Sequence, residues 1–387
     1  MSHPGLPRRL ALFGSTGSIG RNALRVVDAL PGYFEVSVLA AWRSTAELAE
    51  QVDRYRPRHV AVGDASKEAE LRALLPRDFR GVVRSGPSAL AELAGCSDVD
   101  IVLNAVTGAA GLPVSLGAVN TGKRLALANK ESLVAGGPIV MAAAKRTGAE
   151  IVPVDSEHSA LFQALQSGRR HEVKKLILTG SGGPFRTRPK ETFPDVTREE
   201  ALKHPTWSMG PKITIDSATM MNKALEIVEA RWLFDARAAE IDVVIHPQSI
   251  VHSMVLFRDG SVIAQMSKPD MRTAIQYALT YPERRASELE TYSVSAFKTM
   301  TFEEPDFEKF PSLGFGLRAA DDDGVLGAVL NAANETAVEQ FLAGAISFPE
   351  IFRRVGRALQ STAPVASPDL EAVLAADRRA REEAVFA

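Results

Sequence analysis

The first 150 residues alternate short apolar runs with helical patterns, and this alternation restricts the fold more than any other feature of the chain. The runs expected to form buried strands are residues 10–13, 36–41, 59–62, 101–106 and 124–128. Helical spacing occupies residues 19–30, 45–55 and 136–147. Strands that alternate with helices form a parallel sheet covered on both faces. Residues 1–150 are therefore predicted to be an α/β domain with a Rossmann-like, doubly wound parallel sheet.

A glycine-rich turn joins the first predicted strand to the first predicted helix. It reads Gly-Ser-Thr-Gly-Ser-Ile-Gly at residues 14–20. Such a turn lets the backbone approach a pyrophosphate, which then rests on the N-terminus of the helix. The spacing differs from the commoner G-x-G-x-x-G, so the turn is a weak signal by itself. Its position after the first strand favours a dinucleotide site over an ordinary turn.

The end of the second predicted strand indicates which dinucleotide would bind. An NAD site usually places Asp or Glu there, whereas this chain has Arg43 and Ser44. A cation beside a hydroxyl suits a 2′-phosphate, so we expect NADPH in preference to NADH. The alternative is that Arg43 is an ordinary surface cation.

The pattern changes after residue 150. Residues 250–257 and 261–266 flank an Asp-Gly pair, which predicts a β-hairpin. Further strand candidates are residues 176–178, 212–215 and 243–245. We expect a central mixed α+β domain at residues 151–282, a linker at 283–311 and a small C-terminal helical bundle at 312–387. In that bundle, Asp321, Asp322 and Asp323 are candidate helix caps.

Composition narrows the functional classes. The chain has 387 residues, enough for two or three domains, with 24% charged residues and a net charge of -2. This charge gives no electrostatic case for a nucleic-acid or anionic membrane partner. Residues 101–122 are uncharged, but polar side chains, proline and glycines interrupt them, so a membrane span is not expected. The single cysteine, Cys96, favours a reducing compartment, and we expect the cytoplasm.

Two carboxylates follow a short apolar run at residues 151–154. This run is predicted to be a buried strand, so Asp155 and Glu157, two residues apart, are expected to point to the same face at its end, where a divalent cation would relieve their repulsion. The candidate third ligand is Glu226, on a helix that Asp216 or Ser217 could cap. A solvated helix face is the alternative for Glu226. Three hard oxygen ligands favour Mg²⁺ or Mn²⁺, with Co²⁺ as a further candidate.

Residues 180–211 are predicted to form a lid over a substrate. They begin with Gly-Ser-Gly-Gly, contain four further prolines and carry Trp207, which could cover an apolar part of the substrate or belong to the core. Donors suited to a substrate phosphate are Ser181, Ser217, Asn222 and Lys223. Lys130 follows the last strand of the first domain, where it could hold a negative oxygen near the nicotinamide, or be a surface lysine.

Several motifs together resemble the 1-deoxy-D-xylulose 5-phosphate reductoisomerase family. They occur at residues 14–20, 127–132, 153–158, 180–185, 220–223, 226, 229–232 and 246–249, in the family's order and over nearly the whole chain. One stretch departs from the pattern, because Trp42 and Ser44 stand where the family usually has glycine and asparagine. The contacts with the adenosine end of the cofactor are therefore the family residues that this sequence matches least closely.

The resemblance implies a reaction and a set of site residues. 1-Deoxy-D-xylulose 5-phosphate would be rearranged, and the aldehyde formed would be reduced by NADPH to 2-C-methyl-D-erythritol 4-phosphate, an early isoprenoid precursor. The implied metal ligands are Asp155, Glu157 and Glu226, which with Lys130 form the catalytic group. The implied substrate contacts are Lys130, Ser156, Glu157, Ser181, His204, Trp207, Ser217, Asn222, Lys223 and Glu226. The implied NADPH contacts are Thr16, Gly17, Ser18, Ile19, Arg43, Ser44, Asn129, Glu131 and Gly210. The resemblance also implies a homodimer and inhibition by fosmidomycin.

Two alternatives stay open at this point. An NADP-dependent dehydrogenase of another phosphorylated sugar or aldehyde would act without rearrangement and could dispense with a metal. A dinucleotide-sensing regulator would bind the cofactor without turnover, and it would be expected to lack a complete lid and ligand set. The sequence also leaves open whether the carbon skeleton moves by retro-aldol cleavage or by a ketol shift.

Overall fold

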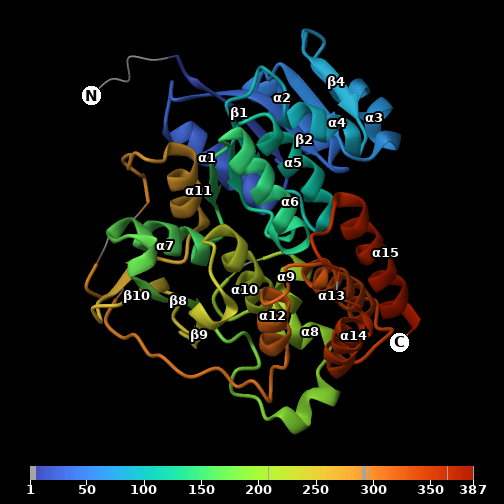
Figure 1. The fold of residues 1–387 in the computed structure, drawn as a ribbon. Coiled ribbons are helices and arrows are strands. Elements are labelled where there is room, and N and C mark those ends of the chain that lie inside the picture. The colour runs from blue at the N-terminus through green and yellow to red at the C-terminus, as the bar shows by residue number, and fades with distance from the viewer. Residues whose placement is uncertain (1–5, 208, 290–292, 296, 364, 387) are drawn as a thin grey trace. The chain divides into compact units, whose positions relative to one another are not determined.

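The computed structural model describes residues 6–207, 209–289, 293–295, 297–363 and 365–386 (Figure 1). These residues form two compact units. The first unit contains residues 1–132, 140–159 and 270–290, and the second contains 133–139, 160–269 and 291–387. The chain therefore passes between the units several times.

A seven-stranded parallel sheet is the centre of the first unit. Its strands are β1 (Arg8–Phe13), β2 (Phe34–Ala41), β3 (His59–Val62), β4 (Val82–Ser85), β5 (Ile101–Asn104), β6 (Arg124–Leu127) and β7 (Ile151–Pro153). Their order is β4-β3-β2-β1-β5-β6-β7, and every pair is parallel. The strand order runs in one direction from β1 to β4 and in the other from β5 to β7, so the switch point, where such sheets bind ligands, lies between β1 and β5. The predicted doubly wound sheet is confirmed.

Helices flank this sheet (Figure 1). They are α1 (Ser18–Ala29), α2 (Thr45–Tyr55), α3 (Glu68–Leu74), α4 (Pro87–Ala94), α5 (Leu112–Asn120), α6 (Glu131–Thr147) and α11 (Met271–Thr280). Helix α7 (Ser156–Ala164) begins in the first unit, but its Leu161 and Ala164 belong to the apolar core of the second. Helix α1 packs on α11, and α4 packs on α5. The sheet is buried from both sides, and Leu10, Leu12 and Phe13 of β1 are fully inaccessible to solvent. Parallel strands need this double cover, which explains their continuous apolar runs.

A smaller mixed sheet belongs to the second unit. Its strands are β8 (Val173–Gly180), β9 (Ile241–Ile245), β10 (Val251–Phe257) and β11 (Val262–Met266), in the order β11-β10-β8-β9. The pair β10–β11 is the predicted Asp-Gly hairpin and is antiparallel, whereas β8 and β9 are parallel. Residues 212–215, a candidate strand in the sequence, lie instead in helix α9 (Pro211–Ala218). Proline at the first helical position favours the helix.

Helices complete the second unit. They are α8 (Arg198–Ala201), α9, α10 (Met221–Leu233), α12 (Ser312–Ala320), α13 (Leu326–Leu342), α14 (Phe348–Ser361) and α15 (Leu370–Phe386). Helix α13 packs against α12, α14 and α15, so the predicted C-terminal helical bundle is present. Of the candidate caps, Asp322 accepts a hydrogen bond from the Leu326 backbone N–H at 2.9 Å.

Helix α10 crosses the core of the second unit. Its residues Met221, Leu225 and Val228 are inaccessible to solvent and belong to one apolar cluster with β8 and the C-terminal helices. The described part of residues 283–311 holds no helix or strand beyond a single bridge between Glu303 and Ile245. Tyr292 of that connection lies outside the described residues.

Candidate active site

The glycine turn lies at the carboxyl edge of the large sheet. Gly14 has a φ of +81°, and its N–H donates to the Ala40 carbonyl of β2 at 2.8 Å. A Cβ on Gly14 would lie 2.4 Å from the Ala105 carbonyl oxygen, and one on Gly20 would lie 2.3 Å from that of Gly14. The backbone is therefore too tightly folded for side chains at these two positions. This close turn suits a pyrophosphate.

The predicted cofactor contacts Thr16, Gly17, Ser18 and Ile19 lead from this turn into α1. Gly17 and Ser18 are exposed, and Thr16 and Ile19 are half-buried. No side chain caps α1 at Gly17, so the turn presents backbone N–H groups at the positive end of the helix dipole. An anionic phosphate fits this arrangement.

Arg43 and Ser44 follow β2 and are exposed, as an adenosine-end contact requires. The Arg43 Nε atom lies 2.7 Å from a carboxylate oxygen of Asp64. Hydrogen bonds from Ser66, and then the one from Arg43, lower the pKa of Asp64 below its ordinary value. Arg43 therefore carries a partner acid that sequence reasoning did not identify.

Lys130 and Asp155 meet at the same carboxyl edge. Lys130 follows β6 and Asp155 follows the neighbouring strand β7, and the Lys130 Nζ atom lies 2.8 Å from Asp155 Oδ2. Both side chains are nearly buried. Burial alone would raise the pKa of Asp155, but the charge of Lys130 and the contact with His158 outweigh it and hold that pKa well below its ordinary value. Asp155 is therefore ionised, and Lys130 is not a surface lysine.

The geometry expected for Asp155 and Glu157 is wrong in one respect. Strand β7 ends at Pro153, and α7 begins at Ser156, so the two acids do not share a strand face. Asp155 instead accepts the Glu157 backbone N–H at 3.2 Å, as a residue capping a helix does. Their carboxylates still come within 4.8 Å of each other, and the Ser156 hydroxyl donates to Glu157 at 2.5 Å. Two hard oxygen donors so close together fit a divalent cation.

Asn129 and Glu131, predicted to contact NADPH, are both buried. The Asn129 side-chain amide donates to the carbonyls of Val106 and Gly108 and to Glu131. A Cβ on Gly111 would lie 2.2 Å from Asn129 Oδ1. The amide thus holds the loop after β5 in place, on the same edge as the glycine turn.

In the second unit, α10 carries Asn222, Lys223 and Glu226. Glu226 is inaccessible to solvent and accepts hydrogen bonds from Asn222 and from Lys223, which is itself 3% exposed. The solvated-face alternative for Glu226 is therefore wrong. The predicted caps are also corrected, because Asp216 and Ser217 lie within α9 and Met220, with a φ of 58°, precedes α10. Buried Asp216 binds Lys212 at 2.7 Å.

The glycine turn after β8 brings several predicted substrate donors together. A Cβ on Gly180 would lie 3.1 Å from Lys223 Cε, and one on Gly183 would lie 2.4 Å from the Ser217 carbonyl oxygen. Gly182 and Gly183 both have positive φ angles. The turn that carries Ser181 is therefore packed against Ser217 and Lys223.

His204 connects this turn, where the predicted lid begins, to the later lid residues Thr206 and Trp207. Its Nδ1 accepts the backbone N–H groups of Thr206 and Trp207 at 3.1 and 2.9 Å, so the proton of the neutral ring lies on Nε2, 3.1 Å from Ser181 Oγ. Burial lowers the pKa of His204 below its ordinary value.

The ring centroids of Trp207 and His252 lie 6.4 Å apart, and His252 Nε2 lies 2.9 Å from Ser267 Oγ. The first part of the predicted lid is anchored, because Phe185 and Phe193 are buried against Phe348. Residues 202–210, including exposed Gly210, lack regular structure where they are described.

Comparison with known proteins identifies the family. Residues 10–137 match the family model for 1-deoxy-D-xylulose 5-phosphate reductoisomerase, residues 151–234 match that of its C-terminal domain, and residues 266–383 match a further DXP reductoisomerase C-terminal domain. The reductoisomerase of Symbiobacterium thermophilum is 51% identical over 98% of each chain, and that of Heliobacterium modesticaldum is 51% identical over 97% of this chain and 96% of its own.

The chain belongs to the 1-deoxy-D-xylulose 5-phosphate reductoisomerase family. Solved members agree in fold as well. The reductoisomerase of Zymomonas mobilis in complex with NADPH superposes with a TM-score of 0.92 at 39% identity, over 98% of each chain. A DOX-P reductoisomerase in complex with NADPH, fosmidomycin and magnesium superposes with a TM-score of 0.91 at 37% identity, over the same share. The chain is accordingly an NADP-dependent reductoisomerase.

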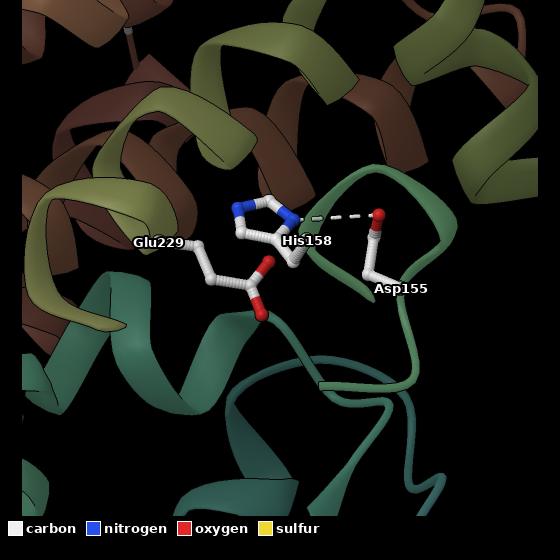
Figure 2. A group of neighbouring side chains, drawn as sticks. All are labelled: Asp155, His158 and Glu229. Carbon is white, nitrogen blue, oxygen red and sulfur yellow. Dashed lines mark ion pairs between the residues drawn. The ribbon is translucent and has the colours of Figure 1, made fainter. Parts of the chain in front are cut away.

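Two buried residues, one in each unit, received no role from the sequence. His158 is inaccessible to solvent, and its Nδ1 lies 3.4 Å from Asp155 Oδ1 (Figure 2). Its position three residues after Asp155, at the start of a helix, was the available signal. Glu229, drawn in the same figure, belongs to the second unit and is fully buried on α10. Glu229 directly follows Val228 on α10, and nothing in the sequence indicated that a glutamate at this position is buried.

Proposed function

We propose that this chain catalyses the rearrangement and NADPH-dependent reduction of 1-deoxy-D-xylulose 5-phosphate to 2-C-methyl-D-erythritol 4-phosphate, with a divalent metal ion as cofactor. The observation that carries the proposal is the buried Lys130–Asp155 pair, which follows two neighbouring strands at the edge that holds the glycine turn. Reductive chemistry needs the dinucleotide and the polarising groups at one edge of the sheet. The family membership supports the same conclusion.

Asp155, Glu157 and Glu226 are the proposed metal ligands, and Mg²⁺ or Mn²⁺ the proposed ion. All three offer carboxylate oxygens, and the depressed pKa of Asp155 keeps that ligand ionised at neutral pH. The bound ion would polarise the carbonyl of the substrate. Lys223 and Asn222 donate hydrogen bonds to Glu226, and both would be available to contact substrate if a cation held that carboxylate instead.

The donors around the second glycine turn are the proposed phosphate contacts. His204 Nε2 donates to Ser181 Oγ, which leaves the hydroxyl hydrogen of Ser181 to point toward a substrate oxygen. Lys223 adds a positive charge, and Ser217 and Asn222 add neutral donors. Trp207 would cover the apolar side of the substrate, with Ser156 on the side of the acids. Lys130 would hold the negative oxygen that develops near the nicotinamide.

The cofactor contacts are proposed as the sequence placed them. Thr16, Gly17, Ser18 and Ile19 would hold the pyrophosphate, and Arg43 and Ser44 the adenosine end. Asn129, Glu131 and Gly210 would contact the rest of the NADPH molecule. Asn129 would do so through its backbone, because its side-chain amide donates to the Val106 and Gly108 carbonyls. Residues 1–150 would thus bind NADPH, residues 151–282 would carry catalysis and dimerisation, and residues 283–311 would link them to the C-terminal helices at 312–387.

A homodimer in the cytoplasm is the proposed working form. Strand β11 lies at one edge of the small sheet and exposes Val262, Ile263 and Met266. An apolar edge strand favours pairing with a second chain. Among the described residues, no helix is both long and apolar enough to cross a bilayer. The single cysteine, Cys96, suits a reducing compartment.

The decisive experiment is an assay of the purified protein with 1-deoxy-D-xylulose 5-phosphate, Mg²⁺ and NADPH. We expect loss of the reduced nicotinamide absorbance and a product with a branched carbon skeleton, identified by NMR. Chelation should stop the reaction, and added Mg²⁺ or Mn²⁺ should restore it. A linear product, or oxidation of NADPH that survives chelation, would instead support a dehydrogenase that acts without rearrangement.

A further inference from the structure

Trp42 is the first residue after β2 and stands at the carboxyl edge of the large sheet. The glycine turn is tied to the same strand end, because the N–H groups of Gly14 and Ser15 both donate to the Ala40 carbonyl, at 2.8 and 2.9 Å. In sheets of this type the pyrophosphate rests on the glycine turn and the adenosine half extends toward the end of the second strand. The indole therefore stands where the adenosine half of the dinucleotide is directed.

The indole is held on one face. A Cβ on Gly63 would lie 2.1 Å from Trp42 Cε3 and 2.5 Å from Cζ3, so the six-membered ring rests directly against the Gly63 backbone. Two hydrogen bonds join the same loops, from Gly63 N–H to the Ala41 carbonyl at 2.9 Å and from Asp64 N–H to the Trp42 carbonyl at 3.0 Å. With 42% of its surface exposed, the side chain leaves its other face to solvent.

The charge of Arg43 is not the whole source of affinity expected for the adenosine half of the dinucleotide. Arg43 is paired with Asp64 at 2.7 Å, so part of its charge is already neutralised before any phosphate arrives. Adenine is a flat aromatic ring system, and tryptophan is the side chain best suited to stack on it. An indole fixed on one face loses little conformational freedom when a base covers the other face.

We propose that Trp42 is a stacking platform for the adenine ring of the dinucleotide, with Gly63 as the positioning residue that sets the plane of the indole. The proposal rests on the proposed function, in which NADPH binds at the glycine turn. Stacking does not sense the 2′-phosphate. Trp42 therefore strengthens NADPH and NADH binding equally, and the preference between them comes from Arg43.

Calorimetry on the full chain separates these contributions. The ligands are NADPH, NADH and reduced nicotinamide mononucleotide, which has no adenosine. Trp42→Ala is expected to raise the Kd of NADPH and of NADH by the same factor, about 5- to 100-fold, and to leave the mononucleotide unchanged. Trp42→Phe keeps an aromatic face and should stay within about threefold of the wild type. Val82→Ala, which shortens an exposed apolar side chain on β4 of the same sheet, is the control.

Gly63→Ala tests the positioning role without touching a ligand. Its Cβ would displace the indole, so this variant should raise the Kd of NADPH while the mononucleotide binds normally. Adding Trp42→Ala to Gly63→Ala should then cost little more, because the two changes remove the same contact.

Unchanged affinity of Trp42→Ala for both dinucleotides would overturn the proposal, as would an equal loss for the mononucleotide. Failure of the wild-type protein to bind NADPH would instead remove the proposed function and the stacking role together.

Discussion

Asp155 and Glu226 place negative charge where the divalent cation is proposed to bind. Replacing either by its amide preserves shape and removes that charge. For Asp155→Asn and for Glu226→Gln we expect kcat to fall on the order of 100-fold or more, because the polarising ion is lost. The Kd of NADPH should stay near the wild-type value, measured by calorimetry. Asp242→Asn, an exposed acid on β9, is the matched control, and near-normal kcat in either variant would refute the metal assignment.

Lys223 has two roles that one substitution can separate. Its ammonium group compensates buried Glu226 before the metal binds and is proposed to bind the substrate phosphate afterwards. Lys223→Ala should raise KM for the phosphorylated substrate and, without metal, lower stability by about 3–5 kcal/mol, because an uncompensated buried charge remains. Saturating Mg²⁺ should therefore raise the Tm of this variant more than that of the wild type. Equal Mg²⁺ shifts together with an unchanged KM would contradict both roles.

The neutral form of His204 holds Thr206 and Trp207 near Ser181 within the predicted lid. Burial lowers the pKa of this imidazole below its ordinary value of 6.5, so the contacts through Nδ1 are intact above the folded-state pKa and are lost as pH falls through it. We expect KM to rise on the acid side of neutrality.

In His204→Asn, the amide oxygen can replace Nδ1 as an acceptor and does not titrate, so this acid limb should disappear. A wild-type KM that stays constant between pH 7 and pH 5 would show that His204 does not report on substrate binding.

Local patterns predicted some elements to the residue. Strand β3 and helix α2 have the predicted bounds, because apolar runs and helical spacing are unambiguous there. Strand β4 was missed, since Val82–Ser85 is short, half-exposed and contains an arginine. Its place is set by pairing with β3, which no local pattern reports.

The candidate site was predictable in residue type and less so in geometry. Asp155 and Glu157 looked like consecutive strand positions because β-branched residues precede them, yet Pro153 ends the strand and Asp155 caps α7. Glu226 looked exposed, since a charged helical residue usually is. Its burial depends on how α10 crosses the second core, which is a tertiary property.

The turn after β8, with which the predicted lid begins, tolerates no side chain at Gly183. Its φ is +66°, and a Cβ would collide with the Ser217 carbonyl oxygen. We expect Gly183→Ala to lower the Tm by several degrees and to raise KM for substrate, because Ser181 and Ser217 would be displaced together. Gly314→Ala in α12 is the control, since open space surrounds that position. It should stabilise the protein by about 0.5–1 kcal/mol, as measured by thermal unfolding.

At the scale of the whole molecule, β11 provides the test of the homodimer. Val262 is 49% exposed on this edge strand. Val262→Asp should convert the dimer to a monomer in light scattering, because like charges from two copies would face each other across the paired edges. Glu371→Asp, a charge-conserving change on exposed α15, is the control. A wild-type monomer, or a variant dimer of unchanged affinity, would exclude this edge as the contact.

The path of helix α6 limits where the chain can be truncated to give a fragment that folds by itself. Residues 133–139 belong to the second unit although residues 1–132 and 140–159 belong to the first, and Val134 packs so closely on α13 that a Cβ on Gly327 would lie 2.1 Å from its carbonyl oxygen. A fragment that stops at residue 150 would keep this apolar turn and lose what covers it. We expect such a fragment to aggregate and to give little soluble protein on refolding, so truncation at residue 150 should not yield an isolated NADPH-binding domain.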